Sequence, residues 1–243
     1  MTRVIRVIDF ETAGEAPPAA VIEVGWCDVV ETADGWNVGS PGSGLCGADR
    51  VTCETRAVHH ISPRDIEGFQ PFHAQEFVGG ALLDGAVALA AHNAQFEAQW
   101  LGPVLGSMSM LCTYKAALRI WPDAPAHKNM VLRYWLEEQG IANIDAALAQ
   151  PAHRAGPDAY VTAHLLKHLL AKTTVEQLIA WTAEPAAMPR CPIGKWRGQK
   201  WADVEEGFLS WMTRQATMEH DLKWNAQREI DRRRAEPMHR TPA

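Results

Sequence analysis

The stretch from Val4 to Gly14 limits the possible folds of this chain more than any other part of its sequence. Its run of β-branched residues, followed by a turn of small residues, predicts a strand. Side chains alternate along a strand, so Asp9 and Glu11 share one face and Phe10 points to the other. Two neighbouring carboxylates repel each other, and a hard divalent cation between them removes that repulsion. The stretch therefore suits a metal site, but a strand end that runs into solvent carries acids equally well.

The rest of the chain alternates between strand and helix patterns. Further strands are predicted at Ala20–Val30, Trp36–Val38, Val87–Ala91 and Met108–Cys112. Asp34-Gly35 predicts a hairpin turn, and the Gly- and Ser-rich stretch Gly39–Gly47 predicts a loop. Ser62 followed by Pro63 is typical of a helix start. A hairpin followed by alternating strands and helices predicts an α/β domain with a mixed five-stranded sheet flanked by helices.

Length and texture predict two parts. With 243 residues, 47% of them hydrophobic, the chain can bury a core in one domain that carries a small appendage. The pattern changes after Lys172, so we predict a first domain over residues 1–172. A linker and a small C-terminal module are predicted over residues 173–243, with the polar tail Glu236–Ala243 disordered.

Signals for membranes and disulfides are missing from the sequence. No apolar run is long enough to span a bilayer, and the N-terminus has no charged-then-apolar signal segment. The five cysteines are odd in number and include no Cys-x-x-Cys pair, so a disulfide framework is not expected. We therefore expect a soluble cytoplasmic protein without a membrane partner. The oligomeric state stays open, with a dimer among the possibilities.

The charge is unevenly distributed along the chain. The net charge of −6 argues against a general binder of polyanions. Residues 190–243 hold 11 Lys and Arg against 8 Asp and Glu, a net of +3, which leaves −9 for residues 1–189. An acidic body and a mildly basic tail suit a metal enzyme with a polyanionic substrate, although +3 over such a length is also ordinary surface.

Two later segments carry acids at the starts of predicted helices. Glu97 ends the segment Ala91–Glu97, where a strand runs into a helix, and ligands of α/β proteins collect at such strand ends. Asp158 lies in the first turn of a helix predicted from Pro157, and His153 lies in the loop before it. The helix dipole favours acids at these positions whatever the function, so each residue alone is ambiguous.

Taken together, the three segments resemble the DEDDh 3′→5′ exonucleases, which have a ribonuclease H-like fold. Those enzymes carry Asp-x-Glu, then His-Asn-Ala-x-Phe-Asp, then His-x-Ala-x-x-Asp-Ala. The first and third motifs are complete here, whereas Glu97 replaces the Asp of the second. The His59–Ser62 stretch also looks like the family's His-x-Ile-Thr segment. The resemblance covers roughly Arg3 to Lys172 and implies a ribonuclease H-like sheet.

The resemblance also implies roles for individual residues. A pair of Mg²⁺ or Mn²⁺ ions would be held by Asp9, Glu11, Glu97 and Asp158. His153 would act as the general base in hydrolysis at a 3′ end, which releases 5′-mononucleotides. The terminal nucleotide would be lined by Thr12, Ile61, His92, Asn93 and Phe96.

The C-terminal part adds a second resemblance. Ile193–Trp211 looks like the Phe-Gly-Lys-Tyr-Arg-Gly module of one DNA-directed branch of the family, and Trp121-Pro122 with His127–Met130 matches the same branch. DNA is therefore expected as the partner. An RNA-directed enzyme of the same group is an alternative, as is a non-catalytic or weakened binding relative, because of Glu97. Trp196 and Trp201 lie among basic residues and suit either base stacking or a small core.

Overall fold

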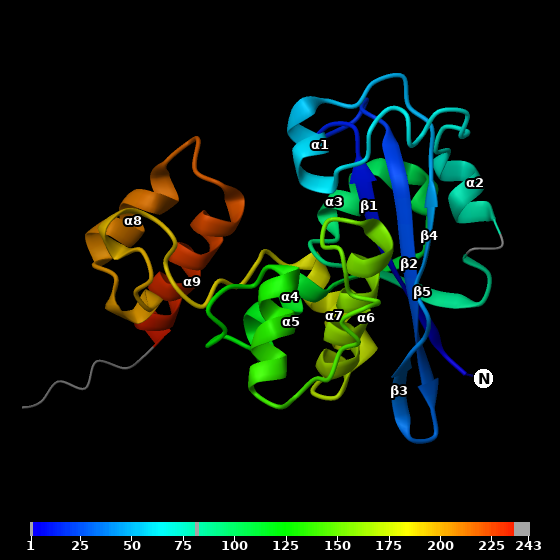
Figure 1. The fold of residues 1–243 in the computed structure, drawn as a ribbon. Helices are drawn as coiled ribbons and strands as arrows, with labels where there is room; N and C mark the ends of the chain where they lie inside the picture. The colour runs from blue at the N-terminus through cyan, green and yellow to red at the C-terminus, as the bar shows by residue number, and fades with distance from the viewer. Residues whose placement is uncertain (1, 81–82, 236–243) are drawn as a thin grey trace, which may run out of the picture.

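The computed structural model describes residues 2–80 and 83–235, and its centre is one mixed sheet (Figure 1). The described strands follow the order β3-β2-β1-β5-β6, with β4 also paired to β2. β1 pairs antiparallel with β2 and parallel with β5, and β5 pairs parallel with β6. The six strands are β1 Val4–Thr12, β2 Val21–Thr32, β3 Gly35–Val38, β4 Gly42–Leu45, β5 Ala86–Ala91 and β6 Ser109–Cys112. The predicted α/β fold with a mixed, helix-flanked sheet is confirmed.

The sheet has six strands rather than the predicted five, because part of the predicted loop Gly39–Gly47 forms β4. A Cβ on Gly42 would lie 2.5 Å from the Trp26 ring, so this strand can pass over the indole only as glycine. Glycine inside a strand often marks such a close approach. The composition that indicated a loop is therefore the one that this edge strand needs.

Helices cover both faces of the sheet (Figure 1). A hydrophobic core lies on each face. The helices that pack around the first core, on the left in Figure 1, are α4 Thr113–Ile120, α5 Asn129–Glu138, α6 Ala155–Leu170 and α7 Val175–Ala183. The second core packs against α2 Ala74–Gly79 and α3 Gln95–Leu101 on the opposite face. Strand β1 serves both cores, because Ile5 and Val7 belong to the first and Ile8 and Phe10 to the second.

The prediction of a helix that starts at Pro63 is wrong. Asp65 Oδ2 accepts hydrogen bonds from the Ser62 backbone N–H (2.7 Å) and hydroxyl (2.8 Å), and the chain there forms turns. The helix of this region is α1 Cys53–His59, which lies before that point and is capped by Thr52. The Asp side chain of a Ser-Pro-x-Asp sequence can accept hydrogen bonds from the backbone N–H groups of a turn as well as of a helix start. Here the turn forms.

The C-terminal part has a hydrophobic cluster of its own. It gathers Cys191, Trp201, Val204, Leu209, Met212, Leu222, Ala226 and Ile230. Within it, α8 Glu206–Arg214 packs against α9 His220–Ala235, at the far left of Figure 1 and apart from the sheet. The division at residue 172 stays a prediction, and α7, which follows it, packs on β6 and α4. The predicted tail Glu236–Ala243 lies outside the described residues. No described helix has the length and apolar character needed to cross a bilayer.

Candidate active site

Three predicted acids meet at the carboxyl end of β1. Asp9 and Glu11 project from the same face of this strand, and Asp158 comes from the first turn of α6. One carboxylate oxygen of each lies within 4.8 Å of the others. Asp158 Oδ2 accepts a hydrogen bond from the His153 backbone N–H (2.9 Å), which ties the preceding loop to the cluster. The pattern of one strand and one helix start thus places three carboxylates in one small volume.

The carboxylates of this cluster repel one another when they are charged. Burial, followed by the charges of Asp158, Glu97 and Glu11, raises the pKa of Asp9 well above its ordinary value. Burial and the neighbouring acids raise the pKa of Glu11 to about 8, although Arg154 opposes part of that shift. Burial raises the pKa of Asp158 to about 6, against the hydrogen bond from His153. A divalent cation would offset this repulsion.

Glu97 lies beside these acids on α3, but it is not one of the three that meet within 4.8 Å. Its side chain is 2% exposed, and burial together with the charge of Glu11 raises its pKa to about 8. Glu97 Oε2 and Asp158 Oδ1 are buried and have no hydrogen-bond partner among the described residues. Buried polar atoms are normally paired. Two orphaned carboxylate oxygens in one acidic cluster therefore fit a metal ion as their missing partner.

A cavity of about 690 Å³ opens next to the acids. Of the predicted residues, Glu11, Thr12 and Phe96 line it. The other walls come from α1 and the strand end, and they include Phe10, Thr55, Val58 and His59. Phe96 packs edge-on against Trp100, with ring centroids 6.1 Å apart, which leaves the phenylalanine ring braced at the cavity wall.

The other predicted nucleotide contacts, Ile61, His92 and Asn93, are not among the residues that line this cavity. Ile61 is buried in a small cluster with Ala13 and Ile22. His92 Nδ1 lies 3.0 Å from Thr113 Oγ1, and its Nε2 lies 2.8 Å from the His127 carbonyl oxygen. Burial lowers the pKa of His92 to about 4, so the ring is neutral near pH 7. These bonds occupy both ring nitrogens, and a direct contact of His92 with substrate stays a prediction.

Two residues of the predicted site have an unusual backbone conformation. Asn93 and His153 adopt positive φ angles of 67° and 59°, which non-glycine residues rarely do. His153 and Asn93 are both exposed, and Asn93 lies at the turn between β5 and α3. Each lies in the turn just before a helix that carries one of the acids: Asn93 precedes α3 with Glu97, and His153 precedes α6 with Asp158.

An ion pair that the motifs do not predict fixes the start of α6 to β2. Glu23, 1% exposed, accepts two hydrogen bonds from the Arg154 guanidinium (2.7 and 2.9 Å) and one from the Ala155 N–H (3.1 Å). A Cβ on Gly25 would overlap the Ala155 backbone, so strand and helix start are in close contact. The only local signal is an acid within the apolar run of β2, since its partner follows 131 residues later.

The raised carboxyl pKa values predict that the metal-free protein becomes less stable as the pH rises. Between about pH 4.5 and pH 8 the folded state holds protons on Glu11 and Glu97 that the unfolded chain releases. The free energy of unfolding should therefore decrease across this window. Saturating Mg²⁺ binds the deprotonated carboxylates and should oppose the decrease.

Thermal melts at several pH values, in EDTA and in Mg²⁺, measure this dependence. Glu97→Gln removes one titrating group and should make the metal-free slope shallower. A metal-free melting temperature that rises through the window, or a slope that Glu97→Gln leaves unchanged, would contradict the prediction.

Comparison with solved structures shows similar folds in two exonucleases. Exonuclease X in complex with 5′-overhanging duplex DNA matches with 26% sequence identity and a TM-score of 0.59, over 74% of this chain and 99% of that chain. The zinc-bound complex of E. coli exonuclease I with single-stranded DNA matches with 14% identity and a TM-score of 0.53, over 74% of this chain and 43% of that chain. No protein-family model and no curated protein matches the sequence.

At 14% identity, exonuclease I supports the fold alone. Exonuclease X supports more, because it matches at 26% identity over nearly its whole length. The fold and its neighbours thus confirm the resemblance that the motifs predict: this chain is similar to the DEDDh-type 3′→5′ exonucleases, with exonuclease X among its structural neighbours.

Proposed function

We propose that this protein is a metal-dependent 3′→5′ exonuclease that hydrolyses DNA from its 3′ end and releases 5′-mononucleotides. The observation that carries the proposal is the cluster of Asp9, Glu11 and Asp158, with Glu97 buried and unpartnered beside them. Such a cluster is unfavourable in itself and becomes favourable when it binds divalent cations. The fold shared with exonuclease X gives the cluster a matching context.

The four acids would hold two Mg²⁺ or Mn²⁺ ions, which supply an activated water and stabilise charge on the leaving 3′-oxygen. His153 is the proposed general base, since histidine is the side chain that most often takes this role and this one is exposed in the loop bonded to Asp158. Its loop is bonded to the Asp158 carboxylate, so the base and the metal ligand keep a fixed relation.

The cavity beside the acids is the proposed site of the terminal nucleotide. Phe96 offers an aromatic wall for the base or sugar, and Thr12 offers a polar one. Ile61, His92 and Asn93 are proposed to contact the same nucleotide; Ile61 belongs to a buried cluster, and His92 is held by its bonds to Thr113 and His127. A preorganised wall of this kind would position the scissile bond.

DNA is the favoured substrate because exonuclease X, the neighbour with 26% sequence identity, was solved in complex with 5′-overhanging duplex DNA. All five cysteines are free thiols, which agrees with a place in the reducing cytoplasm. The activity needs one polymeric partner, a nucleic acid with a 3′ end, and a monomer or a dimer would serve it equally.

The direct test measures nucleotide release from 5′-labelled single-stranded DNA in Mg²⁺ and in Mn²⁺, with matched RNA alongside. Shortening of the DNA one nucleotide at a time from its 3′ end is expected. Preferential shortening of the RNA would assign the enzyme to the RNA-directed branch. No release in either metal would leave a binding relative without catalysis and overturn the proposal.

Glu97 predicts a preference among metals. Its carboxylate sits one methylene, about 1.5 Å, further out than that of the usual Asp, and metal sites tolerate little looseness. We expect the parent to favour Mn²⁺, because Mg²⁺ demands near-ideal geometry. Glu97→Asp should lower the ratio of the Mn²⁺ rate to the Mg²⁺ rate. An unchanged ratio in a variant that stays active would show that Glu97 does not contact the metal.

A further inference from the structure

A compact basic hairpin stands on the surface of the C-terminal part. It spans residues 190–200, and its ends are joined by bonds from the Cys191 N–H to the Gln199 carbonyl (2.9 Å) and from the Gly198 N–H to the Cys191 carbonyl (2.8 Å). It carries no acid, and all four of its cations are exposed: Arg190, Lys195, Arg197 and Lys200. Lys195 forms an exposed ion pair with Glu205 (3.3 Å), which leaves the hairpin with net positive charge.

A stacked aromatic pair, half-buried Phe208 and exposed Trp211, lies against this hairpin. Phe208 and Trp211 are one turn apart on α8 and stack with centroids 5.2 Å apart at 30°, and Trp211 is 42% exposed. A Cβ on Gly194 would lie 3.1 Å from Phe208 Cζ, so the hairpin tip touches the pair directly. We call Lys195, Arg197, Phe208 and Trp211 the basic-aromatic surface.

The structure places Trp196 and Trp201 in the core of the C-terminal part, against which Phe208 also packs. Trp201 is buried and donates from Nε1 to the Met188 carbonyl (2.8 Å), and Trp196 packs against the same cluster. Of the two interpretations of these tryptophans, the small core is therefore the one that the contacts support. The ring that remains available for stacking is Trp211.

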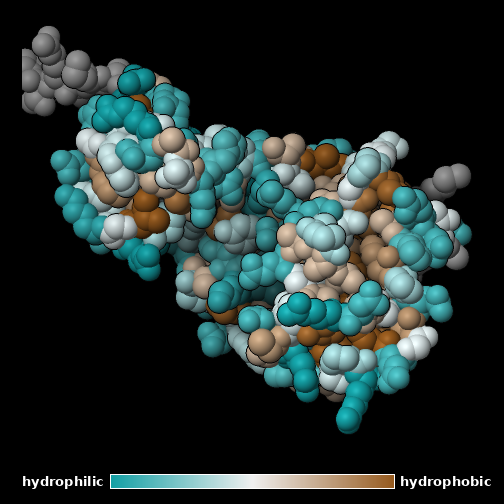
Figure 2. Space-filling view, turned by 90° about the horizontal axis from the view of Figure 1, so that it is seen from above, coloured by the Kyte–Doolittle hydropathy of each residue, from teal (hydrophilic) through white to brown (hydrophobic). Residues whose placement is uncertain are grey.

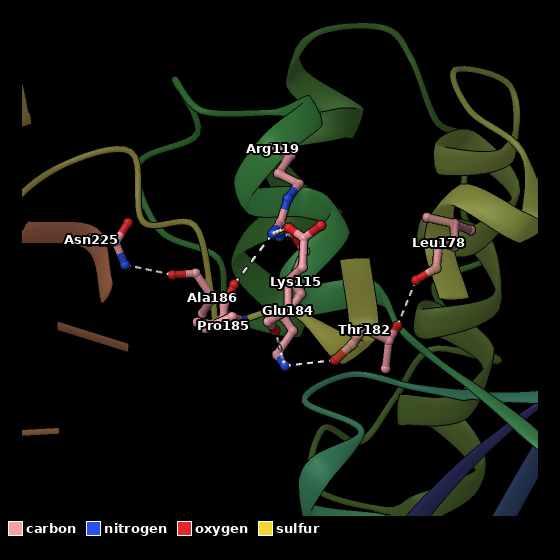
Figure 3. A network of polar contacts seen from close by, with 8 residues as sticks. All are labelled: Lys115, Arg119, Leu178, Thr182, Glu184, Pro185, Ala186 and Asn225. Carbon is pink, nitrogen blue, oxygen red and sulfur yellow. Dashed lines mark hydrogen bonds and ion pairs between the residues drawn. The ribbon is translucent and has the colours of Figure 1, made fainter. Parts of the chain in front are cut away.

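A polar network ties the C-terminal part to the sheet domain (Figure 3). Lys115 Nζ donates to the carbonyls of Thr182 (2.8 Å) and Glu184 (2.6 Å), and Arg119 pairs with the Glu184 carboxylate (2.7 Å). On the other side, Asn225 Nδ2 donates to the Ala186 carbonyl (2.7 Å). The connector is thus bonded to α4 at one end and to α9 at the other, which sets where the basic-aromatic surface stands.

The charges explain why a substrate strand would need such a surface. Residues 1–189 carry a net charge of −9, so the sheet domain repels the phosphates of a long strand. Figure 2 shows a hydrophilic hollow between the C-terminal part, on the left, and the rest of the molecule. A strand whose 3′ end occupies the active site would have to cross this hollow to reach the cations and the aromatic face of the C-terminal part.

We infer that the basic-aromatic surface binds the single-stranded part of the substrate upstream of its 3′ end, with Trp211 stacking on a base and Lys195 and Arg197 contacting phosphates. The inference rests on the proposed nuclease function. It adds a second nucleic-acid site, outside the active site. This site increases the number of nucleotides that the protein contacts and does not contact the scissile phosphodiester bond.

The test compares a long and a short ligand on full-length variants. Trp211→Ala removes the stack, and Lys195→Gln with Arg197→Gln removes two cations. Phe69→Ala and Lys172→Gln are matched controls, because they alter an exposed aromatic and an exposed cation elsewhere. Fluorescence anisotropy in EDTA measures binding of a 20-nucleotide and a 4-nucleotide strand. Hydrolysis of the p-nitrophenyl ester of thymidine 5′-monophosphate, in Mn²⁺, reports on the active site alone.

Trp211→Ala should weaken binding of the long strand about tenfold, in line with the loss of one base stack. The double variant should weaken it and lower its salt slope by about 1.4, or about 0.7 for each lost phosphate contact. Binding of the short strand, hydrolysis of the ester and both controls should match the parent. Unchanged long-strand binding in both test variants overturns the inference. Failure of the parent to hydrolyse the ester instead overturns the proposed nuclease function, whatever the binding shows.

Discussion

Asp9→Asn is expected to lower the rate of nucleotide release by about 1,000-fold, a loss of about 4 kcal/mol of transition-state stabilisation. Asp9 stands at the centre of the cluster, where the charges of Asp158, Glu97 and Glu11 all act on it. Asparagine keeps the size of the side chain but cannot share the charge of a divalent ion. The variant should therefore fold and still fail in catalysis.

The same substitution should make the metal-free protein more stable, because it removes a charge that burial and three acids oppose. Saturating Mg²⁺ or Mn²⁺ should raise the melting temperature of the parent and leave that of Asp9→Asn almost unchanged. The opposite signs of the two effects distinguish a metal ligand from a residue that merely supports the fold. Calorimetry with and without metal measures both.

Asp34→Asn is the matched control, since Asp34 is exposed in the turn between β2 and β3. It should leave the rate and the response to metal unchanged. If Asp9→Asn kept more than a tenth of the parent rate, the acids at this strand end would not be the catalytic cluster.

The motif residues were predictable from the sequence because their positions depend on short-range rules. Strand alternation alone puts Asp9 and Glu11 on one face, and a Gly-Pro helix start alone puts Asp158 in a first turn. Parallel pairing of β1 with β5 then brings the start of α3, and with it Glu97, to the same edge. The resemblance to a family supplied the step from three local patterns to one site.

Other features depend on contacts that no local pattern contains. β4 was missed because Gly42 is needed by the distant Trp26 ring and not by any turn. The ring of His92 is committed to Thr113 and to His127, which a motif cannot show. Glu23 and Arg154 are joined across 131 residues, and only the folded chain brings them together. The sequence therefore predicts the acids that the fold brings together, but not the contacts that hold them in place.

Arg154→Met is expected to lower the free energy of unfolding by about 3 kcal/mol, because it leaves the buried Glu23 carboxylate without its partner. This value is at the low end for buried ion pairs, since the Arg154 side chain is 36% exposed. The substitution should also affect function. Arg154 lies between His153 and Asp158 in sequence and lowers the pKa of Glu11. Its loss should raise the pKa of Glu11 further and so raise the Mg²⁺ concentration that gives half the maximal rate.

A double-mutant cycle and a second ion pair separate these two effects. Adding Glu23→Gln to Arg154→Met neutralises the stranded charge and keeps an acceptor for the Ala155 N–H, so it should recover at least about 1 kcal/mol. Arg6→Met breaks the bidentate pair of Arg6 with Asp28, which joins β2 to β1 rather than to α6 and lies further from the acids. It should cost stability and leave the Mg²⁺ requirement unchanged. If Arg6→Met shifted that requirement as far as Arg154→Met does, the Glu23–Arg154 pair would act on the fold in general and not on the metal-binding cluster.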